Sequence, residues 1–152
     1  MEPAERRSEV EQCNCFAVRK AARRISRLYD DLLQPTGLRI TQFLILAVLA
    51  EAGSATINGL GERLDLERTA MGKTLGPLER DGLVRILPSQ TDGRARVVTL
   101  TREGRRAFLE GRPLWREAQQ RLATLNGEKW IDALRSDLTN MKVGDDDGRA
   151  EA

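Results

Sequence analysis

The stretch from Ala55 to Leu100 limits the fold most, because its apolar residues change from a helical to a strand-like spacing. In the first part, apolar residues recur every three or four positions in two short runs, which Asp65 and Leu66 separate. In the last part, they alternate with other residues on both sides of the turn dipeptide Asp92–Gly93. This order predicts two short helices joined by a turn and followed by a two-stranded hairpin.

The ends and faces of the two helices can also be predicted. Thr56 is placed to cap the first helix by accepting a hydrogen bond from a backbone amide, and Gly82 is placed to end the second. The apolar inner face of the second helix consists of Met71, Leu75 and Leu78. The residues that should then point outward are Arg68, Thr69, Gly72 and Lys73. Two helices and a hairpin in this order form a winged helix-turn-helix, which places its second helix in the major groove of DNA.

These residues resemble the MarR family of bacterial transcription regulators. That family ends its recognition helix in the run Leu-x-x-Leu-Glu-x-x-Gly-Leu-Val, which residues 75–84 match. Its wing carries an Asp-x-Arg turn, which Asp92 and Arg94 match. The similarity covers most of the chain, from about residue 13 to residue 141. Gly72 and Lys73 depart from it, because many relatives have a hydroxyl residue and an arginine at these places.

Caps can also be predicted for two neighbouring helices. Thr41 is placed to cap a helix that is apolar almost all round, so that this helix is expected to be buried. Thr101 is placed to cap the helix that follows the hairpin.

Helices are predicted on both sides of the winged helix-turn-helix domain, which is expected to span residues 38–100. Residues 12–34 and 101–142 each carry an apolar seam that so small a domain cannot cover, so that a partner chain or a separate helical layer is needed. The MarR resemblance implies a homodimer, with the two wings facing the half-sites of a pseudo-palindrome. The predicted fold is therefore mainly α with a small β-hairpin wing, and its N- and C-terminal helices form a dimerisation layer. Residues 1–11 and 143–152 are predicted to be disordered.

Composition narrows the function further. The 152 residues contain no histidine, which excludes histidine metal sites, a Ser-His-Asp triad and an imidazole pH switch. No other catalytic or metal-binding constellation is evident, so neither an enzyme nor a cofactor is expected. No apolar run approaches the ~18 residues of a membrane helix, and the first residues lack the apolar core of a secretion signal. A cytoplasmic protein that does not enter a membrane is therefore expected.

The net charge is only +2, so the placement of the basic residues matters more than their number. The predicted DNA-contacting residues are Thr56, Asn58, Arg68, Thr69, Lys73, Thr74, Asp92, Arg94 and Arg96. Arg94 at the wing tip suits insertion into the minor groove, and Asp92 either pairs with an arginine or only forms the turn. Thr56 and Asn58 start the supporting helix, whose exposed amides suit a phosphate. Arg63 is expected to lie on the same face of the motif as Arg68, Lys73, Arg94 and Arg96. The basic residues of the first helix are either solvated or contact phosphates at a distance.

Two cysteines near the start of the first helix suggest that the protein senses oxidants. Cys13 and Cys15 are two positions apart, and side chains at that spacing on a helix diverge, which disfavours a disulfide between them. Residues 12–29 also resemble the organic-peroxide-sensing branch of MarR regulators, in which a Cys-Phe pair carries the reactive thiol and a tyrosine fourteen residues later stabilises it. Cys15 and Tyr29 match that pattern, but Ile40 replaces a second tyrosine of that site. The alternative is that both cysteines are structural.

A second kind of effector is a small organic ligand, bound between the dimer helices and the DNA-binding domain. Tyr29, Phe43 and Trp115 are the residues that would line such a crevice, and the alternative is that they are ordinary core. Either effector would release a repressor by changing the spacing of the two recognition helices. The rival to DNA binding is a helical dimerisation or scaffold module that uses its winged helix to bind protein.

Overall fold

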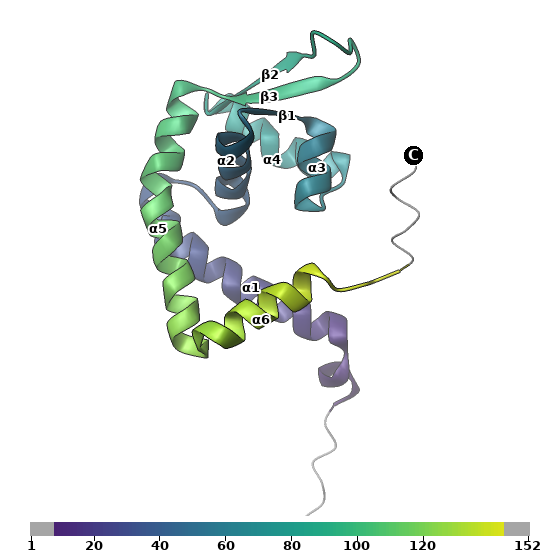
Figure 1. Cartoon of the computed structure of the whole chain (residues 1–152), viewed down its shortest axis with the longest axis vertical. Coiled ribbons are helices and arrows are strands. Elements are labelled where there is room, and N and C mark those ends of the chain that lie inside the picture. The colour runs from purple at the N-terminus through teal and green to yellow at the C-terminus, as the bar shows by residue number, and fades with distance from the viewer. Residues whose placement is uncertain (1–7, 145–152) are drawn as a thin grey trace, which may run out of the picture. The chain divides into compact units, whose positions relative to one another are not determined.

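The computed structural model describes residues 8–144 and is mainly helical, with one small antiparallel sheet (Figure 1). The helices are α1 (Asn14–Leu33), α2 (Ile40–Ala52), α3 (Ile57–Leu64), α4 (Arg68–Arg80), α5 (Arg102–Asn126) and α6 (Glu128–Thr139). The strands are β1 (Ser54–Thr56), β2 (Val84–Pro88) and β3 (Arg96–Leu100). Short 3-10 helices cover Glu9–Gln12 and Gln34–Thr36. The predicted fold class, mainly α with a small β-hairpin wing, is confirmed.

The chain divides into two compact units, residues 1–115 and residues 116–152. The predicted disordered ends lie mostly outside the described residues, but residues 9–11 of that prediction belong to the 3-10 helix Glu9–Gln12. Among residues 8–144, no single helix is long and apolar enough to cross a membrane; α1 and α2 meet that test only together, as a pair bent by 72°.

The sheet has one strand more than the sequence predicted. Its order is β1-β3-β2, and both pairings are antiparallel. In the wing, Val84 lies opposite Leu100 and Pro88 opposite Arg96, as expected for a hairpin. The added strand pairs Ala55 with Val98. Three residues between a helix end and a helix cap are too few to show an alternating pattern, which explains why β1 was missed.

Several predicted helix ends are confirmed by their hydrogen bonds. The Thr56 hydroxyl accepts from the Gly59 amide at 2.9 Å, and so caps α3. Gly82 follows α4 with φ +75°, a left-handed conformation that ends helices. The Thr101 hydroxyl caps α5 by accepting from the Gly104 amide at 3.0 Å.

Thr101 does more than cap α5. Its hydroxyl donates to the Gly82 carbonyl at 2.6 Å, and its amide donates to the Leu83 carbonyl at 3.1 Å. Gly104 packs so closely on Leu83 that a Cβ at residue 104 would overlap the Leu83 carbonyl. The end of α4, the sheet and the start of α5 therefore meet without any loose linker.

The predicted cap of α2 is wrong. Thr41 was expected to cap this helix, but α2 begins at Ile40, and Thr41 lies within its first turn, exposed. The Ile40 amide instead donates to the Asp30 carboxylate of α1 at 2.7 Å, and the Arg39 amide donates to the Gln42 side chain at 3.0 Å. The main acceptor comes from another helix, so a local sequence pattern does not reveal it.

The core of the first unit surrounds α2, as its nearly continuous apolar sequence predicted. Four of its side chains are fully buried, and helices α3 and α4 and the sheet add further buried residues. The core residues from these elements are Phe43, Ile45, Leu46, Leu49, Leu60, Met71, Leu75, Leu78, Val84 and Val98. This packing fixes the inner face of α4 and thereby decides which side chains the helix presents to solvent.

In the second unit, α5 continues to Asn126, after passing Pro113 without a break in the helix, and α6 follows a turn at Gly127 (φ +91°). None of the residues of α6, all of which the structure describes, is buried. Its Trp130 and Leu138 are 55% and 45% exposed, and Leu125 at the end of α5 is 76% exposed. This unit therefore presents apolar side chains that its own fold does not cover.

Candidate nucleic-acid interface

Helices α3 and α4 form the predicted helix-turn-helix. Asp65 ends α3 in the left-handed conformation (φ +51°), and the Leu66 amide donates back to the Gly61 carbonyl at 2.8 Å. A Cβ at Gly61 would lie 2.7 Å from the Leu66 carbonyl oxygen, so the tight turn requires glycine there. The turn sets the direction in which α4 leaves, with its apolar side on the core.

The outer face of α4 is confirmed for four of the predicted residues. Arg68, Thr69, Gly72 and Lys73 are all exposed, while Met71, Leu75 and Leu78 are buried. Thr74 does not share this face: it is half-buried, and its hydroxyl donates to the Ala70 carbonyl at 3.0 Å. Its hydroxyl is therefore engaged by its own helix and is not presented on the exposed face.

Most of the predicted cations are available for phosphates. Within residues 8–144, Arg68, Lys73, Arg94 and Arg96 form no ion pair, and all four are exposed. Arg63 differs, because its guanidinium lies 2.6 Å from the Glu51 carboxylate. Cations without a carboxylate partner can exchange solvent ions for phosphates without first breaking a contact.

The wing tip is built by side-chain hydrogen bonds to backbone amides. The Asp92 carboxylate accepts from the Arg94 amide at 3.1 Å, and the Ser89 hydroxyl accepts from the Asp92 amide at 3.2 Å. Asp92 is therefore the turn-former, and the alternative pairing with an arginine side chain is not formed in the described residues. Ser89 was not among the predicted site residues, although a serine before a turn is a usual capping residue.

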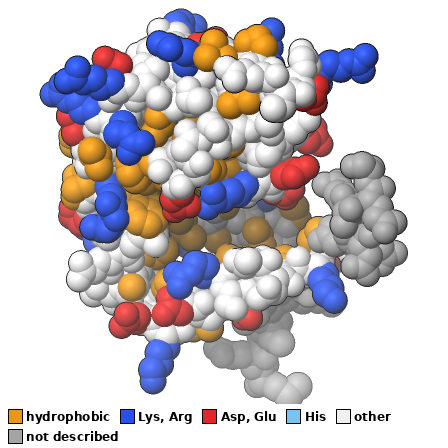
Figure 2. All heavy atoms as spheres, turned by 45° about the horizontal axis from the view of Figure 1, so that its top comes forward, with side chains coloured by type: hydrophobic (Ala, Val, Ile, Leu, Met, Phe, Trp, Pro, Cys, Tyr) orange, Lys and Arg blue, Asp and Glu red, His pale blue; other side chains and the backbone are white. Residues whose placement is uncertain are grey.

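The start of α3 has exposed polar residues, as predicted. Thr56 and Asn58 are exposed, and the Thr56 hydroxyl is committed to capping the helix. Figure 2 looks obliquely onto the sheet end of the molecule and shows Lys and Arg side chains in several separate groups, with acidic side chains between them. The surface is thus not uniformly basic, which agrees with the low net charge.

The two cysteines are exposed, free and differently placed. Cys13 is the residue before α1, has an extended backbone, and its sulfur accepts from the Phe16 amide at 3.5 Å. Cys15 lies in the first turn of α1. The expectation that both diverge from one helix is therefore wrong, because only Cys15 is helical.

The structure does not bring Cys15 and Tyr29 together within one chain. Both lie on α1, and fourteen residues of helix span roughly 21 Å. Tyr29 is also buried, with 6% of its surface exposed. The predicted stabilisation of the thiol by this tyrosine is therefore not formed inside the protomer.

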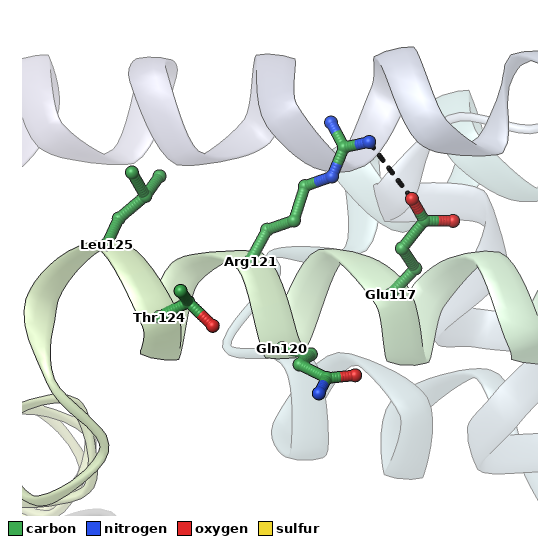
Figure 3. A pocket seen from close by; sticks show the side chains of 5 residues that line it. All are labelled: Glu117, Gln120, Arg121, Thr124 and Leu125. Carbon is green, nitrogen blue, oxygen red and sulfur yellow. Dashed lines mark hydrogen bonds and ion pairs between the residues drawn. The ribbon is translucent and has the colours of Figure 1, made fainter.

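The aromatic residues predicted to line a ligand crevice lie in the core. Phe43 is 1% exposed and stacks on Phe108 and Trp115, with ring centroids 5.7 and 5.9 Å apart. A pocket of about 490 Å³ lies elsewhere, on the second half of α5 (Figure 3). Its lining residues are Glu117, Gln120, Arg121, Thr124 and Leu125. Arg121 reaches along the helix to Glu117 at 3.0 Å, and Gln120 points to another side.

Comparison with known proteins agrees with this geometry. The MarR family description matches residues 36–95, which include α2, α3, α4 and β2. The organic hydroperoxide resistance transcriptional regulator of Bacillus subtilis is 28% identical over 96 residues, which cover 63% of this chain and 65% of that protein. The chain thus matches slightly less than two thirds of the length of this curated relative.

Solved structures extend the similarity to most of the chain. The transcriptional regulator MosR of M. tuberculosis, solved in complex with DNA, is 34% identical, with a TM-score of 0.71 over 85% of this chain and 99% of MosR. The transcriptional repressor CouR, bound to a 23-mer DNA duplex, is 26% identical, with a TM-score of 0.77 over 87% of this chain and 94% of CouR. The protein therefore belongs to the MarR family, whose members are transcription regulators rather than enzymes.

Proposed function

We propose that the protein is a homodimeric repressor of the cytoplasm that binds a pseudo-palindromic operator and is released from it by an effector. The observation that carries this proposal is the outer face of α4, where exposed Arg68 and Lys73 have no carboxylate partner within residues 8–144. Two structurally similar regulators, MosR and CouR, have been solved with DNA, and CouR is a repressor. Both support DNA as the ligand of this face.

Each element has a distinct role in this proposal. Helix α4 enters the major groove, where Thr69 and Lys73 reach base edges and Arg68 contacts the adjacent phosphate. Arg94 enters the minor groove from the wing, held by the turn that Asp92 forms, and Arg96 contacts the phosphates beside it. The start of α3, with Thr56 and Asn58, presents backbone amides to a phosphate.

Dimerisation is supported by apolar side chains outside the winged domain. On the first half of α1, Phe16 and Val18 are 39% and 45% exposed, and every residue from Asn14 to Arg24 is exposed. Helix α6 has twelve residues, which is too short for an isolated helix to be stable in water. Burial of these faces by a second copy would supply the missing stabilisation and set the spacing between the two α4 helices.

Thiol oxidation is the effector that the structure favours. Cys13 and Cys15 are both exposed in the single chain, and one curated relative is named for organic hydroperoxide resistance. In this reaction a thiolate attacks the peroxide O–O bond, which forms a sulfenic acid and expels an alkoxide or hydroxide. A small organic ligand is less well supported, because Phe43 and Trp115 are occupied in stacking with each other.

The decisive experiment measures binding to the DNA upstream of the protein's own gene by fluorescence anisotropy. We expect Arg94→Ala to weaken binding and to lower the slope of log K against log salt by about one, whereas Arg112→Ala, an exposed arginine of α5, should do neither. Mild peroxide should release the DNA reversibly, and Cys15→Ser should abolish that release. If no duplex binds at low salt, the scaffold function replaces this proposal; binding that is indifferent to oxidant would point to an organic ligand.

A further inference from the structure

Two glycines of the recognition helix have no role in packing. The described helices contain six glycines, at positions 59, 61, 72, 76, 104 and 111. At four of them a Cβ would meet another group at 3.0 Å or less, for example the Phe43 ring beside Gly111. At Gly72 and Gly76 a Cβ would meet nothing within 4 Å. Among the glycines of the described helices, the two of α4 are thus the ones that packing in the interior does not explain.

Backbone conformation does not explain them either. Neither residue is among the glycines with positive φ, so an alanine fits the same helical backbone at both places. Glycine is among the poorest helix formers, and two of them within thirteen residues weaken α4. The sequence therefore keeps a less stable recognition helix than the fold requires.

The position of the two glycines gives the reason. Gly72 and Gly76 are four residues apart, so they follow each other along one side of α4, and both are exposed. Thr69 and Lys73 are exposed on the neighbouring row, while Met71, Leu75 and Leu78 are buried against the core. The outer face of α4 therefore carries a strip of bare backbone beside a row that holds a hydroxyl and an ammonium group.

We propose that Gly72 and Gly76 are specificity-determining residues, which let the α4 backbone approach the base edges of the operator more closely than any side chain would allow. This inference rests on the proposed function, because the face must enter a major groove. Without a Cβ at either position, the helix can lie deeper in the groove, and the base-pair edges opposite the strip are selected by shape. Thr69 and Lys73 then reach their bases from a shorter distance.

The test uses the full chain, a duplex from upstream of its own gene, and an unrelated duplex of equal length. Gly72→Ala and Gly76→Ala should each raise the melting temperature by about 2–4 °C, because alanine favours the helix. Each should weaken operator binding by about tenfold or more, as a mismatched base pair does. Binding to the unrelated duplex and its salt dependence should change less than about twofold, since the phosphate contacts remain.

Thr74→Ala is the matched control, because it improves the helix propensity of α4 without placing an atom on the outer face. It should raise the melting temperature and leave operator binding unchanged. Operator affinity unaltered in both glycine variants would overturn this inference while leaving the proposed function intact. Equal weakening by Thr74→Ala would also overturn it, because stiffness of α4 would then be the cause. Failure of the wild-type protein to bind either duplex would overturn both proposals.

Discussion

The side chain of Asp30 offers a sharp test of how α1 and α2 are held together. One carboxylate oxygen accepts from the Ile40 amide at 2.7 Å, and the other lies 3.4 Å from the Arg39 guanidinium. The first contact satisfies an amide at the start of α2, whose partner would otherwise have to be water. The second is an ion pair in which the arginine side chain is 78% exposed and the aspartate 24%.

These two contacts differ in their contribution to stability. An exposed ion pair is worth about 0–1 kcal/mol, and the long N–O distance places this one at the low end. A lost helix cap costs about 1 kcal/mol, and more where the acceptor is charged and partly buried. We therefore expect Asp30→Ala to lower the free energy of unfolding by about 1.5 kcal/mol. Asp30→Asn, which keeps an oxygen acceptor, and Arg39→Ala should each cost about 0.5 kcal/mol.

The assay is urea and thermal unfolding at one fixed protein concentration, because association of chains would make stability depend on concentration. For a chain of this length, the expected loss in Asp30→Ala corresponds to a melting temperature lower by about 3–6 °C. The three variants should thus rank with Asp30→Ala clearly below the other two. Equal destabilisation by Arg39→Ala and Asp30→Ala would refute the reasoning, because the ion pair and not the cap would then dominate.

Three further predictions concern the wing, its base and the C-terminal helix. Gly104→Ala places a Cβ onto the Leu83 carbonyl and should cost about 2–3 kcal/mol, measurable by urea unfolding; a stability equal to that of the wild type would contradict the close packing. Asp92→Ala should weaken DNA binding more than Asp92→Asn, which can still accept from the Arg94 amide, whereas equal loss would mean that the charge itself matters. Trp130→Lys should shift sedimentation toward monomer by placing a charge on the exposed face of α6, and an unaltered sedimentation coefficient would place the dimer contact elsewhere.

The sequence predicted elements whose signals are local. The apolar spacing of α2, α3 and α4 and the caps by Thr56 and Thr101 are determined by neighbouring residues, and the structure confirms them. The exposed residues of α4 followed directly, because the buried side of a helix fixes its other side.

The features that were missed depend on partners distant in sequence or on strands too short for a pattern. Strand β1 exists because it pairs with β3, more than forty residues later. The cap of α2 comes from Asp30, ten residues earlier, and displaced the local candidate Thr41. For Asp92, the sequence left two roles open. Whether its carboxylate accepts from a backbone amide or pairs with an arginine side chain depends on the geometry of the turn.

Three of the hydrogen bonds of Thr101 bear on how motion can pass through the protein. This residue links the end of α4 and the sheet to the first turn of α5. We therefore expect the helix-turn-helix and the start of α5 to move as one rigid body. A rotation of the first turn of α5 is then expected to move the end of α4 with it. Any bending of α5 should then occur farther along the helix. Pro113 is suited to such bending, because proline has no amide hydrogen to donate to the carbonyl of Leu109.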